Sequence, residues 1–130
     1  MDCYLKTFTA IAVAGFVSLG TSSAFASGDA ANGATLFKAN ICSACHATVK
    51  RGASPIGPNL FGVAGRKAGS MAGYTYSPAM KASGITWDEA AIAKYVTSPA
   101  TVVPGTKMVF PGIKKQQDAE DVAAYLATLK

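Results

Sequence analysis

The motif "CSACH" at residues 42–46 constrains this chain more than any other feature, because it places two thiols and an imidazole side by side. His46 is the only histidine in the sequence. A redox-active disulfide, part of a metal site and the attachment point of a cofactor all use cysteines at this spacing. Each use requires different residues elsewhere, so the rest of the sequence decides among them.

The N-terminal segment has the pattern of a secretory signal peptide. An uncharged, mostly apolar run at residues 8–19 follows Lys6, and the triplet Ala-Phe-Ala at residues 24–26 has the small-x-small form of a cleavage site. We expect cleavage after about Ala26, export to the bacterial periplasm, and loss of Cys3 with the leader. The alternative is an uncleaved N-terminal membrane anchor, although the run is shorter than the roughly 20 residues that span a bilayer.

The remaining residues, 27–130, have the length of a single domain. The chain has 12 basic and 7 acidic residues and a formal net charge of +5, and one residue of each sign lies in the leader. The basic residues are dispersed, without the dense patch typical of nucleic-acid binding. We therefore expect acidic protein partners and no nucleic acid.

Local patterns predict helices separated by long loops. A helix can begin at Asp29 and continue to about Ile41, and a short one is expected near residues 78–82. The segment Thr86-Trp-Asp-Glu89 reads as a capping box for a helix that ends near Thr97. The last helix is expected from about Asp118, with Asp118, Glu120 and Asp121 in its first turn, at the positive end of the helix dipole. It has one apolar face. That face is formed by Val122, Tyr125, Leu126 and Leu129.

The segment between residues 47 and 83 is rich in Gly, Pro, Ser and Ala and shows no strand alternation. A stretch of roughly 35 residues with so little regular structure is unusual in a compact domain. We infer that this loop wraps around something that the chain binds.

This sequence lacks the residues that most other uses of the motif require. Structural zinc normally has four Cys or His ligands, whereas residues 27–130 offer Cys42, Cys45 and the adjacent His46 only. Blue-copper and Rieske sites need two histidines. A thioredoxin-like pair follows a strand, and no strand pattern precedes Cys42. An inert disulfide leaves His46 and the long loop unexplained.

The spacing C-x-x-C-H is the signature of covalently attached c-type haem. In such sites both thiols bond the haem vinyl groups and the histidine reaches the iron. A second axial ligand is then expected from a methionine, and Met71, Met80 and Met108 are available. Met108 is favoured because it lies in the Gly-Pro loop "PGTKMVF" rather than on a helix face, where methionine usually fills a core.

The segments "CSACH", "GPNLFGVAGRKAG", "YTYSPAMKASGITW" and "PGTKMVFPGIKK" resemble class I cytochrome c of the mitochondrial type and its bacterial c2 and c-550 relatives. The resemblance covers residues 28–129. It implies a small all-α domain, helices wrapped with long loops around one covalently bound haem c, and a monomer. It also implies that the first and last helices cross, with Gly33 and Phe37 against Val122 and Tyr125.

The resemblance implies a set of haem contacts. Cys42 and Cys45 would form the thioethers, His46 would be the proximal ligand and Met108 the distal one. The carbonyl of Pro58 would accept a hydrogen bond from the other nitrogen of His46.

Five further residues match residues that lie around the haem in members of the family. Arg66, Tyr76 and Trp87 match residues that hold the propionates. Tyr95 matches a pocket residue near the methionine sulfur, and Phe110 an aromatic beside the exposed haem edge.

The chain also departs from the family pattern. One extra residue lies between Gly33 and Cys42, so the end of the first helix is expected to turn differently. Met80 stands where the family often has asparagine. Ala100 and Thr101 stand where mitochondrial forms carry lysines.

These features together predict a soluble one-electron carrier, not an enzyme. It would pass electrons from a membrane-bound donor, such as a quinol-oxidising cytochrome complex, to an oxidase, reductase or reaction centre. Acidic redox partners would dock transiently at a haem edge bordered by Lys107, Lys114 and Lys115. The alternative is a haem enzyme or gas sensor with an open sixth position on the iron, against which Met108 argues.

Overall fold

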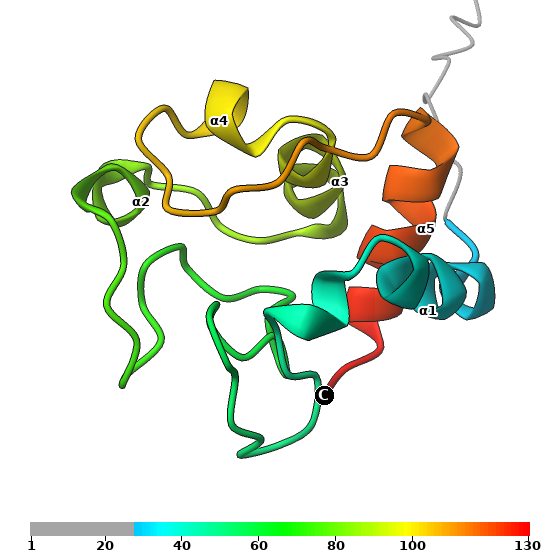
Figure 1. The fold of residues 1–130 in the computed structure, drawn as a ribbon, viewed down its shortest axis with the longest axis horizontal. Helices are drawn as coiled ribbons and strands as arrows, with labels where there is room; N and C mark the ends of the chain where they lie inside the picture. Colours follow the sequence, from blue (N-terminus) through cyan, green and yellow to red (C-terminus); the bar gives the residue numbers. More distant parts are fainter. Residues whose placement is uncertain (1–27) are drawn as a thin grey trace, which may run out of the picture.

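The computed structural model describes residues 28–130, so the expected leader and its cleavage site lie outside the described residues. Figure 1 shows short helices joined by long loops. The helices are α1 (Ala30–Ala39), the 3-10 turn η1 (Cys42–Ala44), α2 (Pro78–Ala82), α3 (Glu89–Thr97), α4 (Pro99–Val102) and α5 (Gln116–Ala127). Over the described residues, β pairing is limited to an isolated antiparallel bridge between Lys67 and Thr86. The predicted all-α class is therefore confirmed.

Helices α1 and α5 pack directly on one another (Figure 1). A Cβ built on Gly33 would collide with the carbonyl oxygen of Asp121, so only glycine lets the two backbones approach this closely. One turn later, the rings of Phe37 and Tyr125 lie with their centroids 5.6 Å apart. The predicted crossing of the first and last helices is confirmed.

Asp121 ties the start of α1 to α5. Its carboxylate accepts hydrogen bonds from the backbone N–H of Asp29 at 2.8 Å, the side-chain amide of Asn32 at 2.7 Å and that of Gln117 at 2.9 Å. These bonds lower the pKa of Asp121. The sequence pattern placed Asp121 in the first turn of the last helix as a partner for the helix dipole. The helix instead begins at Gln116, and Asp121 is a buried cross-link between helices.

Two other helix ends differ from the sequence-based expectation. The N-cap of α3 is Asp88, whose carboxylate accepts from the N–H of Ala91 at 2.7 Å. Thr86 is instead paired with Lys67 and lies before the cap, so the predicted capping box is wrong. The helix ends at Thr97 as expected, but a further short helix, α4, then begins at Pro99, whose ring suits a first helical position.

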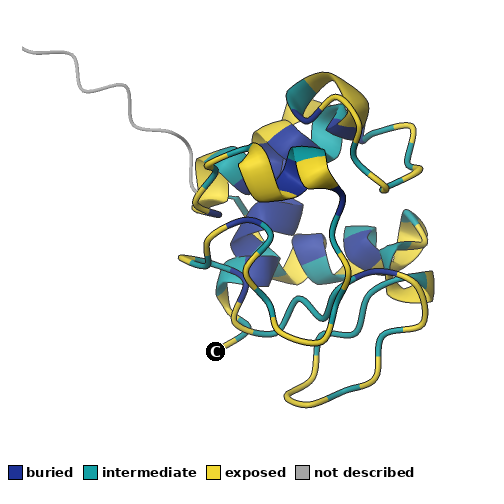
Figure 2. Ribbon diagram, turned by 90° about the vertical axis from the view of Figure 1, so that its left-hand side faces the viewer, coloured by how far each residue is buried: buried dark blue, intermediate teal, exposed yellow. Residues whose placement is uncertain are grey.

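Hydrogen bonds within the long loop region, and one between this region and the C-terminal segment, hold it in place. The side-chain amide of Asn59 donates to the carbonyls of Val49 and Gly52, at 2.9 and 2.8 Å. The N–H of Gly62 donates to the carbonyl of Leu129 at 2.7 Å. Buried residues gather on the facing sides of the helices and at a few loop positions (Figure 2). Between residues 28 and 130, no helix is long and apolar enough to cross a membrane.

Candidate haem-binding site

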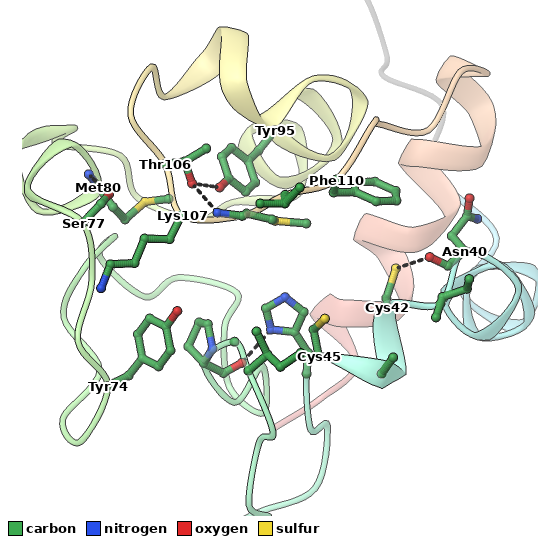
Figure 3. Close-up of a pocket in the computed structure, with 18 of the residues that line it drawn as sticks. Asn40, Cys42, Cys45, Tyr74, Ser77, Met80, Tyr95, Thr106, Lys107 and Phe110 are labelled. Atoms are coloured by element: carbon green, nitrogen blue, oxygen red, sulfur yellow. Dashed lines mark hydrogen bonds between the residues drawn. The ribbon is translucent and has the colours of Figure 1, made fainter.

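The helices and loops enclose a cavity of about 700 Å³. Its wall combines the segment that carries the C-x-x-C-H motif, the loop at residues 56–58, the start of α2 and the loop at residues 106–111. Figure 3 shows Met80, Tyr95 and Phe110 along one side of the cavity and Tyr74 and Cys45 along the other. The cavity thus brings together segments that are far apart in the sequence.

The backbone carbonyl of Pro58 orients the imidazole of His46. Its Nδ1 lies 2.7 Å from the carbonyl oxygen of Pro58, as predicted. Because a carbonyl only accepts, Nδ1 is the donor, and Nε2 of the neutral ring keeps a free lone pair. Burial lowers the pKa of His46, which the bond to Pro58 partly opposes. The ring is therefore preset as a neutral metal ligand.

Gly57 explains why the imidazole can lie so close to this loop. A Cβ at position 57 would lie 2.7 Å from Nδ1 and 3.0 Å from Nε2 of His46. The N–H of Gly57 donates to the carbonyl of Cys45 at 2.8 Å, which fixes the loop beside the motif. The sequence pattern assigned no role to Gly57, although its place directly before Pro58 was a signal.

Cys42 and Cys45 are both free thiols at the cavity wall and are not joined in a disulfide. Burial raises the pKa of Cys42, and the neighbouring Cys45 adds to this effect. Immediately before them, Ile41 has a left-handed backbone with φ 60° and ψ 18°. Helix α1 ends at Ala39, two residues earlier than predicted, and this left-handed residue reverses the chain before Cys42. This turn lies in the segment between Gly33 and Cys42, where the end of the helix was expected to turn differently.

Two of the three candidate methionines line the cavity. Met108 and Met80 both contribute to its wall, whereas Met71 does not. Met80 is buried in α2, with its N–H bonded to the hydroxyl of Ser77. Met108 lies in the loop between α4 and α5, where its N–H donates to the hydroxyl oxygen of Thr106 at 3.2 Å.

The loop that carries Met108 is attached to two other parts of the fold. The hydroxyls of Tyr95 and Thr106 are hydrogen-bonded at 2.7 Å, which connects the loop to α3 (Figure 3). The ammonium of Lys107 donates to the carbonyl of Thr75 at 2.8 Å, which connects it to the segment before α2. Burial raises the pKa of Tyr95, so its hydroxyl stays protonated at neutral pH.

Eight of the ten predicted site residues line the cavity: Cys42, Cys45, His46, Pro58, Tyr76, Tyr95, Met108 and Phe110. Arg66 and Trp87 do not. The guanidinium of Arg66 donates to the carbonyl of Asn59 at 2.9 Å, and Trp87 packs on Tyr95 with ring centroids 5.0 Å apart. Their predicted contact with the propionates stays a prediction. Tyr74, which the sequence pattern did not single out, lines the cavity and forms an edge-on pair with Tyr76.

The residues fit a haem with two thioethers and two axial ligands. A neutral imidazole, a thioether and a pair of free thiols face one largely apolar cavity. Over residues 28–130, no three Cys, His, Asp or Glu side chains lie together where they could hold a metal ion.

Comparisons with known proteins agree with this class of site. A profile of the family described as Cytochrome c matches residues 30–130. Cytochrome c2 of Rhodomicrobium vannielii is 48% identical over 118 residues, covering 91% of this chain and 93% of that protein. Cytochrome c-550 of Nitrobacter winogradskyi is 47% identical over 100 residues, covering 77% and 90%. Cytochrome cH from Methylobacterium extorquens has a similar structure, with a TM-score of 0.71 and 47% identity over 78% of this chain and 99% of that one.

The fold and the cavity define a class I c-type cytochrome, an electron-transfer protein with one covalently attached haem c. The chain belongs to the cytochrome c family. Members of this family carry electrons between redox partners and are not enzymes, which confirms the predicted class of function.

Proposed function

We propose that this chain carries one electron at a time from a membrane-bound donor to a terminal acceptor, with His46 and Met108 as the axial ligands of its haem. The observation that carries this proposal is the cavity into which both side chains and the two free thiols converge. The haem, when bound, supplies the one-electron couple between Fe(II) and Fe(III). The chain's residues attach it, set its potential and exclude water.

Each of the four central residues has a role that suits its chemistry. The thiols of Cys42 and Cys45 form the thioethers that keep the cofactor on the chain. Nε2 of His46 is the proximal ligand, because Nδ1 is occupied by the carbonyl of Pro58. The thioether of Met108 is a neutral, weak ligand that favours Fe(II) and raises the reduction potential.

Residues around these four hold the site in place. Tyr95 restrains the loop of Met108 through Thr106. Tyr74 and Tyr76 line the cavity, and their hydroxyls would be available as polar partners for the carboxylates of a bound haem. Phe110 lines the cavity beside the exposed Val109 and shields one edge of the site.

The surface near the Met108 loop suits an acidic partner. Lys107, Lys114 and Lys115 are exposed. None of the described side-chain carboxylates lines the cavity, and Asp118, three residues after Lys115, is the one nearest to these lysines in the sequence. We place the docking face for the redox partner at these lysines, on a chain that acts as a monomer in the bacterial periplasm after removal of its leader.

Three methionine variants test the ligand assignment. Met108→Ala should lower the reduction potential, abolish the low-spin spectrum and let the reduced protein bind carbon monoxide. Met71→Leu should leave all three unchanged, because Met71 does not line the cavity. Met80→Leu keeps an apolar side chain of similar volume and should also keep the ligand. If Met80→Leu instead gives the open site and Met108→Ala does not, the assignment of Met108 is wrong.

A further inference from the structure

Helix α1 contains the sequence Asn32-Gly33, the pair that deamidates most readily in unfolded chains. In this reaction the backbone nitrogen of the glycine attacks the side-chain carbonyl carbon of the asparagine. A new C–N bond forms, ammonia leaves, and water opens the resulting succinimide to aspartate or isoaspartate. Glycine speeds the reaction because no side chain shields its nitrogen.

We propose that Asn32 is a deamidation site that the folded domain protects, and that its modification in an unfolded chain prevents α1 from packing on α5. The proposal rests on the hydrogen bonds of Asn32 and Gly33 and on the packing of Gly33. It is independent of the electron-carrier function.

The fold protects Asn32 by geometry. Its side chain is solvent-exposed, so water is not excluded. The attacking nitrogen of Gly33 lies in α1 and donates to the carbonyl of Asp29 at 2.8 Å. The leaving amide of Asn32 donates to Asp121 at 2.7 Å. The helix must open, and both bonds must break, before the nitrogen can reach the side-chain carbonyl.

Packing also explains why the chain keeps a reactive pair. Any side chain at position 33 would collide with the carbonyl of Asp121, so Gly33 cannot be replaced by a residue that slows the reaction. Asn32 supplies an N–H donor to a buried carboxylate, which an aspartate at that position cannot supply. The α1–α5 crossing thus requires both members of the pair.

Deamidation would replace the hydrogen bond from Asn32 to Asp121 with repulsion between two carboxylates. An ionised aspartate at position 32 would direct a carboxylate oxygen at Oδ2 of Asp121, where the amide now donates. Asp121 would lose one of its three hydrogen-bond donors and would face a second carboxylate, and like charges this close disfavour each other's ionised form. Among the other charged side chains of the two helices, Asp29, Asp118 and Glu120 are acidic, whereas Lys38 lies in the last turn of α1 and Lys115 is the N-cap of α5. Tyr125, which packs beside Gly33, is uncharged at neutral pH. Isoaspartate would in addition insert a methylene group into the helix backbone.

The first experiment compares Asn32 in folded and unfolded protein. The complete holoprotein is incubated at mildly alkaline pH with and without guanidinium, and deamidation is followed by peptide mass spectrometry. Asn40-Ile41 and Asn59-Leu60 are internal controls, since a bulky residue follows each asparagine. Asn32 should react fastest in the unfolded chain and at least about tenfold more slowly in the folded one, because the helix must open first. Equal rates in the two states would overturn the proposal.

The second experiment separates the new charge from the lost hydrogen bond. Asn32→Asp and Asn32→Ala both remove the amide donor, but only the first adds a carboxylate. At neutral pH the folded-to-unfolded ratio of Asn32→Asp should be about tenfold below that of Asn32→Ala, a repulsion equivalent to about one pKa unit. The difference should disappear in acid, where one carboxylate is protonated. Equal stability of the two variants at neutral pH would reject the effect on packing.

Discussion

The carbonyl oxygen of Pro58 and Nδ1 of His46 are 2.7 Å apart, so the backbone of a loop fixes the orientation of the imidazole. Gly57, directly before Pro58, lies against the same ring and leaves no room for a side chain. The orientation of the proposed iron ligand therefore depends on two residues that are not themselves proposed as ligands.

Replacing Gly57 with alanine should displace the imidazole. The new methyl group would lie within 3.0 Å of both ring nitrogens, and overpacking of this kind destabilises proteins by about 1–3 kcal/mol. We expect a lower haem-loaded fraction, a changed reduction potential and a weaker bond from His46 to Pro58, measured by absorbance spectra and redox titration.

Gly65→Ala is the control for this variant. Gly65 has φ +86°, and no atom lies within 4 Å of the point that a Cβ would occupy, so its replacement strains the backbone without touching His46. It should lower the stability of the protein and leave the reduction potential unchanged. If both variants change the potential equally, Gly57 has no specific effect on the ligand.

Charge reversal at Lys114 should slow association with an acidic redox partner. Lys114→Glu is the cleaner choice, because Lys107 also restrains the Met108 loop through Thr75. The association rate should fall several-fold at low ionic strength, and the effect should fade as salt screens charges beyond about 8 Å. Lys94→Glu, on the exposed side of α3, makes the same change in net charge and should have a smaller effect. Equal effects of the two variants would contradict a local docking face.

Asp121→Asn should lower the free energy of unfolding at neutral pH by about 1–3 kcal/mol, because the amide cannot accept all three hydrogen bonds. The pKa of Asp121 is lowered in the folded state, so its stabilisation is complete above the unfolded value of 3.8 and is lost as the pH falls through the folded value. Denaturant titrations should therefore show the two proteins converging in acid. Asp118→Asn, which removes a half-buried carboxylate of the same helix, should have little effect at either pH.

Ile41→Gly should cost less stability than Ile56→Gly. A β-branched residue with φ 60° is strained by about 1–3 kcal/mol, and glycine relieves this strain. Both isoleucines line the cavity and are similarly exposed in the structure, at 70% and 69%, so both variants lose the same kind of contact with a bound haem. Ile56 is not among the residues with positive φ. Thermal unfolding should therefore show a higher melting temperature for Ile41→Gly than for Ile56→Gly, and equal melting temperatures would show that position 41 is not strained.

Local sequence patterns determined the helices and the chemistry of the site. Asp29 caps α1 because its short carboxylate reaches the free N–H groups of the first turn, and Ser98-Pro99 ends α3 because the position before proline disfavours helix. The motif at residues 42–46, whose two thiols and imidazole are neighbours in the chain, predicted the cofactor once the residues that its other uses require were found to be missing from the sequence. The bond from His46 to Pro58 was also predicted, through the resemblance of the surrounding segments to a known family.

Only the tertiary structure decided which side chains meet across the fold. The sequence predicted a capping box that starts at Thr86, but Thr86 pairs with Lys67 and Asp88 caps α3 instead. Asp121 was expected in the first turn of the last helix, and the close crossing at Gly33 instead buries it against α1. Local patterns reflect the preferences of residues that are neighbours in the chain. The burial and pairing of these polar groups depend instead on contacts between residues about 20 to 90 positions apart. The geometry of those contacts exists only when the helices have packed.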